Sequence, residues 1–244
     1  MELPMFLSKL PVNVVSRKFR RDIANVHEMH RTVMAAFPDI ERSTARSEHG
    51  VLWRLDRTAQ GYVLYVQSRT QPTWDRLPEN YLCDRGKVRS LQPVLRAVRA
   101  GTTFRFRIVA NPTRRLKPQN DHRNDGNRRH NRRVPLHRPD ERTSWLVRQA
   151  EQRGFVLPTA STGEPDVTAT PLPELSGRQQ DSTEGTASPR HNKITIAPVR
   201  FDGRLVVTDP EELSRAIQDG IGPAKAYGCG LLSLAPAGND AGGE

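Results

Sequence analysis

The sequence predicts an α+β protein built from two tandem ferredoxin-like domains. Residues 193–236 read as strand, turn, strand, helix, glycine-rich loop and strand, which is the second half of a ferredoxin-like fold. Residues 5–68 begin with the order strand, helix, strand, strand. The length of 244 residues fits two such domains, which we expect at 1–95 and 96–244.

In the first half, short apolar runs and one helical period indicate the elements. Strands are expected at 5–10, 51–56 and 62–68. One helix is expected over about 21–37, and 74–85 has no regular pattern. Residues 91–98 are expected to be the second helix of this domain or its remnant.

The second half begins with a strand at 103–110 and continues with a helix from Pro139 to Arg153, capped by Asp140. Residues 118–131 contain almost no apolar side chains, so this segment is expected to form a disordered basic loop. Residues 159–192 are rich in Pro, Ser, Thr and Gly, which favours a long insertion or mobile loop.

The tail contains a predicted hairpin and a strongly signalled helix. Ile194–Val199 alternates as a strand, Asp202 and Gly203 form the expected turn, and Leu205–Val207 returns as a second strand. Asp209 precedes a proline and two glutamates, so a capped helix should begin there and end near residue 219.

The most informative segment is the glycine-rich loop at 220–230. Glycine is used where φ must be positive or where another group must come close, and this loop holds Gly220, Gly222, Gly228 and Gly230. Lys225 is its only charged residue, so the loop is a candidate phosphate cradle. The spacing of a P-loop is absent. The alternative is a tight connection between helix and strand.

The charge distribution indicates an anionic partner such as RNA. The net charge is +11, and residues 96–148 alone hold fourteen arginines and one lysine against four acids. Arginine suits bidentate phosphate contacts, whereas a solvated surface is the alternative. The candidate RNA-binding arginines are Arg105, Arg107, Arg114, Arg115, Arg128, Arg129, Arg132 and Arg133, together with the more generic Arg20 and Arg21.

The candidate catalytic residues are His27 and His30, which lie three apart on one helix face. A metalloprotease motif would need a second histidine at 31, where the chain has Arg31, and no carboxylate cluster is evident, so no metal site is predicted. Two cysteines are too few for a disulfide scaffold, which favours a cytoplasmic protein, and no membrane span is predicted.

Three separated motifs resemble the CasE family, the repeat-processing endoribonucleases of type I-E CRISPR (Cascade) systems. They are the run Glu28-Met29-His30-Arg31, the strand Phe104–Pro112 with its Ala-Asn-Pro ending, and the glycine block Gly220–Lys225 with Gly228–Pro236. The three occur in the family's order and together cover most of the chain.

The resemblance implies two RNA-recognition-like domains and a metal-independent endoribonuclease that requires no cofactor. It implies partners: the stem-loop of CRISPR repeat RNA, the mature guide RNA, and other Cascade subunits. It places His30 in proton transfer as acid or base. Lys225 and the loop amides are our own candidates for stabilising the charged phosphorane. The family usually has a tyrosine where this chain has His27, which leaves the second proton-transfer role open. The alternatives are a non-catalytic RNA-binding subunit and a structural RNA-binding protein.

Overall fold

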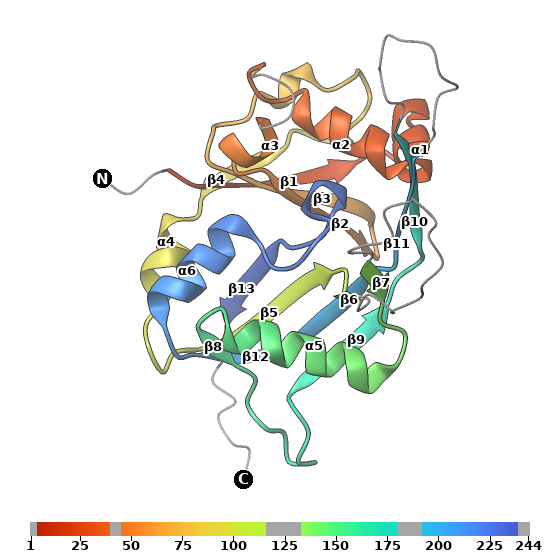
Figure 1. Ribbon diagram of the computed structural model, residues 1–244. Coiled ribbons are helices and arrows are strands. Elements are labelled where there is room, and N and C mark those ends of the chain that lie inside the picture. Colours follow the sequence, from red (N-terminus) through yellow and green to blue (C-terminus); the bar gives the residue numbers. More distant parts are fainter. Residues whose placement is uncertain (1–3, 40–44, 116–132, 180–191, 239–244) are drawn as a thin grey trace, which may run out of the picture.

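The computed structural model describes residues 4–39, 45–115, 133–179 and 192–238, and every structural statement below concerns these residues. Two antiparallel sheets form the two halves of the molecule (Figure 1). The segment between the last helix and the last strand lies between the halves, so a loop from the second half reaches the first. The predicted fold class, tandem ferredoxin-like domains, is confirmed.

The first sheet has the strand order β2-β3-β1-β4. Its strands are β1 (Phe6–Val12), β2 (Leu52–Thr58), β3 (Gly61–Ser68) and β4 (Lys87–Ser90). Helices α1 (Arg17–Ala24) and α2 (Val26–Met34) cover one face, where Phe19, Met29 and Val33 pack on Trp53 and Leu64. β2 and β4 are the two edges, and β4 was not predicted.

The prediction of one helix over 21–37 is wrong. The chain forms two helices because Asn25 between them has an extended backbone, with φ −139° and ψ 102°. Its side-chain oxygen accepts a hydrogen bond from the backbone N–H of His27 at 3.1 Å, which caps α2. The break therefore fixes where the helix that carries both histidines begins.

A helix is present where one was predicted at 91–98, as α4 (Gln92–Ala97). It follows β4, whereas the second helix of a ferredoxin-like order lies between the third and fourth strands. Between β3 and β4 the described residues have only the short 3₁₀ helix η1 (Trp74–Arg76). Helix α4 crosses the expected boundary between 1–95 and 96–244, and those domain limits stay a prediction.

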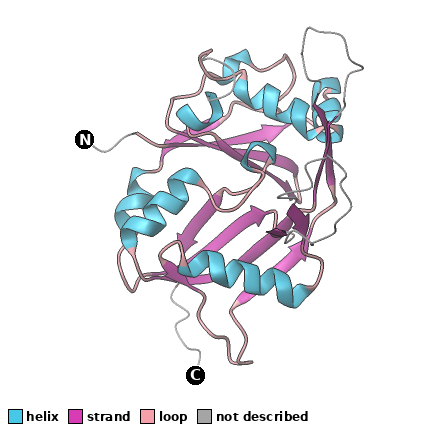
Figure 2. Ribbon diagram, in the orientation of Figure 1, coloured by secondary structure: helices cyan, strands magenta, loops and turns pink. Residues whose placement is uncertain are grey.

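The second sheet has the strand order β13-β5-β12-β8, and β9 also pairs with β12. Its strands are β5 (Thr103–Ala110), β8 (Phe155–Val156), β9 (Val167–Pro171), β12 (Val199–Val207) and β13 (Leu232–Pro236). Helices α5 (Pro139–Glu151) and α6 (Pro210–Asp219) cover one face over a core that includes Phe106, Ile108, Leu146 and Leu213 (Figure 2). The predicted cap of α6 is confirmed, because Asp209 accepts hydrogen bonds from the N–H groups of Glu211 and Glu212.

The hairpin predicted across Ile194–Val207 is wrong. Strand β12 runs straight through Asp202 and Gly203, and β11 (Asn192–Ile196) pairs with β10 (Leu175–Gln179) instead. Gly203 is needed for packing, because a β-carbon there would collide with the carbonyl oxygen of Asp166. An Asp-Gly pair inside a strand thus marks a close backbone approach rather than a turn.

Two further expectations need correction. The segment 159–192 is not one long loop, because β9 and β10 both fall inside it, while 180–191 lies outside the described residues. Helix α5 is not capped by Asp140: its N-cap is Arg138, without a side-chain cap bond, and Asp140 forms an ion pair with Arg138 at 3.0 Å. The expected disordered loop at 118–131 also lies outside the described residues.

Candidate active site and nucleic-acid interface

Helix α2 places both histidines at the boundary between core and solvent. Val26, Met29 and Val33 are buried, whereas His27 and His30 are half-buried. The Nδ1 atoms of the two imidazoles are buried and have no hydrogen-bond partner in the described part of the chain. Neither ring is therefore held in one tautomer from its Nδ1 side.

The surroundings of His30 disfavour its charged form. Burial, the nearby His27 and the Arg46 guanidinium lower the pKa of His30 to about 4. The imidazole is therefore neutral at pH 7. A neutral imidazole has a lone pair that can accept a proton, so His30 suits the role of a general base.

The glycine loop from the second half contacts this helix. Its central turn is the 3₁₀ helix η2 (Lys225–Tyr227), and the Tyr227 ring lies edge-on to His30 with the ring centroids 6.4 Å apart. The indole N–H of Trp53 on β2 donates to the carbonyl oxygen of Ala226 at 3.1 Å. The structure thus brings His30 and the loop together, although 190 residues separate them in sequence.

All four glycines of the loop have positive φ, between 76° and 95°. A β-carbon at Gly228 would lie 2.8 Å from the Trp53 ring, and one at Gly220 would lie 2.9 Å from Leu52. One at Gly222 would meet Trp145 at 3.0 Å. Protein side chains therefore occupy the space that these glycines leave, and RNA contact by the glycines stays a prediction.

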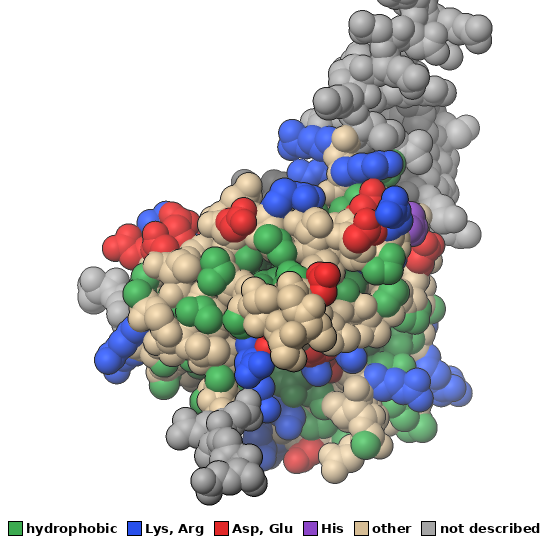
Figure 3. Space-filling model, turned by 90° about the horizontal axis from the view of Figure 1, so that it is seen from below, with side chains coloured by type: hydrophobic (Ala, Val, Ile, Leu, Met, Phe, Trp, Pro, Cys, Tyr) green, Lys and Arg blue, Asp and Glu red, His purple; other side chains and the backbone are tan. Residues whose placement is uncertain are grey.

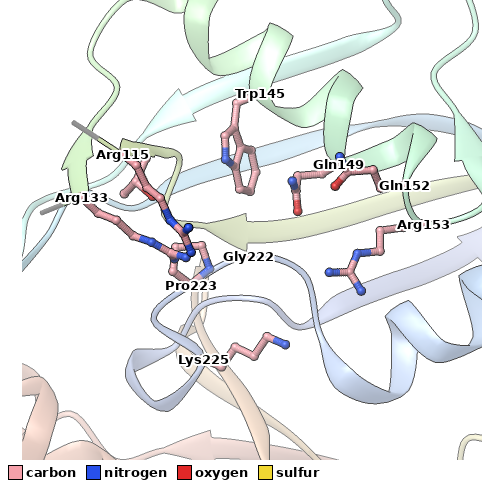
Figure 4. Close-up of a pocket in the computed structure, with 10 residues that line it drawn as sticks. Arg115, Arg133, Trp145, Gln149, Gln152, Arg153, Gly222, Pro223 and Lys225 are labelled. Atoms are coloured by element: carbon pink, nitrogen blue, oxygen red, sulfur yellow. The ribbon is translucent and has the colours of Figure 1, made fainter. Parts of the chain in front are cut away.

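A cavity of about 700 Å³ opens beside the loop (Figure 4). Arg115 and Arg133 lie next to each other near Pro223, while Lys225 and Arg153 extend from opposite walls. No acid lines this cavity among the described residues. The lining residues are Thr113, Arg115, Arg133, Trp145, Gln149, Gln152, Arg153, Gly222, Pro223 and Lys225. Such a surface suits a phosphate-bearing ligand.

Lys225 is half-buried among other cations. Burial and the charges of Arg153 and Arg46 lower its pKa, and Asp219 opposes this effect. Arg46, on the short helix α3 (Ala45–Glu48), is itself half-buried and donates to the carbonyl oxygen of Val51 at 3.2 Å. It has no acid within ion-pair distance in the described ranges. Groups from three elements thus repel one another, and an anion between them would relieve the repulsion.

Sequence reasoning missed Arg46, Arg153 and Tyr227. The two arginines stand alone in the sequence, without a motif, so no pattern distinguishes them from solvated surface charge. Tyr227 lies inside the predicted loop, and its ring was the available signal, because a large aromatic side chain in a glycine-rich turn needs a surface on which to pack.

The other predicted arginines have different environments. Arg115 and Arg133 face each other across the small hairpin of β6 (Thr113–Arg115) and β7 (Arg133–Pro135), beside Arg114, which pairs with Glu141 at 3.7 Å. Arg20, Arg21 and Arg105 are exposed. Arg107 is held by Asp56 and Asp202. Arg128, Arg129 and Arg132 lie outside the described residues.

Figure 3 shows one face of the molecule, where Lys and Arg side chains form several separate groups rather than one continuous patch. Within the described ranges no group of three or more His, Cys, Asp or Glu residues could hold a metal ion. No helix in the same ranges is long and apolar enough to cross a membrane.

The fold and the site define a tandem ferredoxin-like protein with paired helical histidines beside a cationic cavity. A family model described as CRISPR associated protein matches residues 5–236, so the chain belongs to this family. The chain is 36% identical over 234 residues to the "CRISPR-associated endoribonuclease Cse3" of Thermus thermophilus, covering 95% of this chain and 100% of that one. It is 30% identical over 233 residues to the "CRISPR system Cascade subunit CasE" of Escherichia coli, with the same coverage.

A solved structure, that of Thermus thermophilus Cse3 bound to an RNA representing a pre-cleavage complex, matches 96% of this chain and 100% of its own. Its TM-score is 0.73 at 35% sequence identity. The resemblance to the CasE family is therefore confirmed over nearly the full chain.

Proposed function

We propose that this protein is the endoribonuclease that processes CRISPR repeat RNA in a type I-E Cascade system. Its relatives are named as an endoribonuclease and a Cascade subunit, and a similar structure holds RNA before cleavage. The observation that carries the proposal is the position of neutral His30 against the loop of a second domain, next to Lys225 and Arg46.

The chemistry is a transesterification that these residues can perform without a metal ion. His30 accepts the proton of a ribose 2′-hydroxyl, and the resulting oxygen attacks the adjacent phosphorus. The bond from phosphorus to the 5′-oxygen breaks, and that oxygen receives a proton from an acid, for which His27 is our candidate. The products carry a 2′,3′-cyclic phosphate and a 5′-hydroxyl. Lys225 stabilises the additional negative charge of the pentacovalent phosphorane.

The proposed substrate is the stem-loop of repeat precursor RNA, cut at the 3′ base of the stem, and the protein then stays with its guide RNA among the other Cascade subunits. The cationic cavity and the arginines of the β6–β7 hairpin support RNA as the partner, because an A-form stem is recognised mainly through its shape, phosphates and 2′-hydroxyls. A cytoplasmic location is part of this proposal.

The decisive experiment is single-turnover cleavage of a repeat hairpin in EDTA. We expect wild-type protein to cut, and His30→Ala to lose cleavage by about 10²-fold or more while binding RNA, since removal of a general base typically costs that much. His137→Ala is the matched control, because His137 is exposed and lies outside the site.

Full activity of His30→Ala would overturn the assignment of His30. Loss of wild-type cleavage in EDTA, restored by a divalent ion, would overturn the metal-independent mechanism. Tight binding of the hairpin by wild-type protein with no cleavage would identify the second candidate, a non-catalytic RNA-binding subunit.

A further inference from the structure

Three consecutive residues of β2 reach the glycine loop and the strand that follows it. Leu52 packs against Gly220, and Trp53 packs against Gly228 and donates to Ala226. The next side chain, Arg54, points to the opposite face of the sheet from Trp53, because side chains alternate along a strand. It crosses to the second half of the molecule.

Arg54 makes three contacts there through one nitrogen. Its Nη1 donates to the Ser233 hydroxyl at 3.0 Å, to the carbonyl oxygen of Leu231 at 3.3 Å and to that of Arg107 at 3.4 Å. The residue is only 3% exposed. Segment 226–233 is therefore held at both ends by neighbouring residues of one strand from the other half.

Asp56 fixes the direction of this guanidinium. Its two carboxylate oxygens accept from Nε and Nη2 of Arg54 at 2.8 and 3.1 Å, a bidentate pair at 8% exposure of Asp56. The ring of Tyr65 lies under the guanidinium, 5.4 Å from Cζ. The carboxylate of Asp56 thus fixes one edge of the guanidinium and Tyr65 covers one of its faces, which directs Nη1 toward the second half.

The second half presents a matching row of polar side chains. Asp202, Arg107 and Ser233 are direct neighbours across β12, β5 and β13. Arg107 lies 3.5 Å from Asp56 and 2.5 Å from Asp202. Arg107, predicted from sequence to bind RNA, is thus already paired with two acids at the boundary between the halves.

We infer that Arg54 and Asp56 are positioning residues that hold the glycine loop, with Lys225 and Tyr227, in register with His30. The buried charged pair is directional and fixes the strand that follows the loop, in addition to the hydrogen bond from Trp53 to Ala226, whereas Leu52 contributes an apolar contact without direction. The kinetic part of this inference rests on the proposed endoribonuclease function, and the structural part does not.

The test uses two variants and two readouts. Ser233→Ala removes one partner without leaving a buried charge, and the double variant Arg54→Met with Asp56→Asn removes the pair without leaving a lone ion, which keeps the protein folded. Arg215→Met is the matched control, because Arg215 pairs only with Glu211 and Glu212 on the surface of α6. The readouts are single-turnover cleavage against the Kd for an uncleavable hairpin, and hydrogen exchange of the amides of residues 220–231.

We expect the double variant to lose at least about 10-fold in cleavage rate with less than about 3-fold change in Kd, and Ser233→Ala to lose less. Amides of the glycine loop should exchange faster, while those of α2 and α6 stay as in the wild type. The single variant Arg54→Lys keeps the positive charge but should also cleave more slowly than the wild type, since an ammonium lacks the planar fork of the guanidinium. Unchanged loop exchange, or a wild-type rate in a folded double variant, would overturn the inference. If the wild-type protein is inactive and the loop of the double variant exchanges faster, the proposed function is overturned, whereas the structural part of the inference stands.

Discussion

At the scale of single residues, the sequence identifies His30 but cannot give its environment. The run from Glu28 to Arg31 marks the position, whereas the neutral state of His30 depends first on burial and then on the nearby His27 and Arg46, and these surroundings exist only in the fold. Lys225 could be selected because it is the only charge in the loop. Arg153 could not be selected from the sequence, because its approach to Lys225 depends on how α5 lies against the loop.

The lowered pKa of His30 predicts a specific loss of stability in acid. Its pKa is about 4 when folded and near 6.5 when unfolded, so between these values the unfolded state binds more protons. The free energy of unfolding should therefore fall as the pH drops from 6.5 toward 4. His30→Gln should reduce the loss between pH 7 and pH 5 by on the order of 1–2 kcal/mol, measured by urea unfolding. An unchanged pH dependence would contradict the buried, neutral imidazole, and His137→Gln is the control.

Lys225 should contribute to cleavage without contributing to stability. Lys225→Ala should lower the single-turnover rate by on the order of 10²-fold, because a positioned charge at the phosphorane is removed. The thermal midpoint should stay the same or rise, since the variant removes repulsion from Arg153 and Arg46. Lys87→Ala on the exposed strand β4 serves as the control. A wild-type rate for Lys225→Ala would exclude the lysine from the site.

At the scale of elements, patterns within one segment predict the limits of helices and strands well. They do not predict which segments pair with one another. The limits of β5 and the cap of α6 follow from local sequence, and both are confirmed. The break at Asn25 and the straight path of β12 depend on contacts that a local pattern does not contain, such as the approach of Asp166 to Gly203.

Gly228 and Gly101 form a natural comparison for the glycine loop. Their φ values are 80° and 79°, but a β-carbon at 228 would meet Trp53 at 2.8 Å, whereas one at 101 would meet nothing within 4 Å. Gly101→Ala should lose about 1–2 kcal/mol for the backbone alone. Gly228→Ala should lose at least about 1 kcal/mol more for overpacking, measured by urea unfolding. Equal losses would show that Trp53 does not confine the loop, and would favour an RNA-facing role for Gly228.

The arginines of the β6–β7 hairpin should govern the salt dependence of binding. Neutralising Arg114, Arg115 and Arg133 to glutamine should weaken RNA binding and flatten the log–log salt dependence by roughly 0.7–0.9 per lost phosphate contact. Filter binding across salt concentrations measures this slope. Arg89→Gln on the outer edge strand β4 should leave it unchanged, and an unchanged slope in the triple variant would mean that the hairpin carries only solvated charge.

At the scale of the whole molecule, two domains of one fold class share a single site. The tandem architecture follows from the order of predicted elements, and it is confirmed. The contacts that join the halves, such as those of Gln67 with Ile217 and Arg69 with Asp219, leave no signal in a single sequence. They join groups 150 residues apart in the sequence, so no local pattern contains them.

The position of β13 also has a consequence for the time course of biosynthesis. Arg54 binds Leu231, 177 residues later in the chain, so β2 waits for its covering strand until nearly all described residues have been made. At roughly 5–20 residues per second, about seven to thirty seconds separate the completion of β4 from the synthesis of β13. During that interval the face of β2 that carries Leu52 and Arg54 is uncovered, and exposed apolar surface on an incomplete chain promotes aggregation. The charges of Arg54 and Asp56 keep this face hydrated, so the same pair protects the nascent chain before it joins the finished halves.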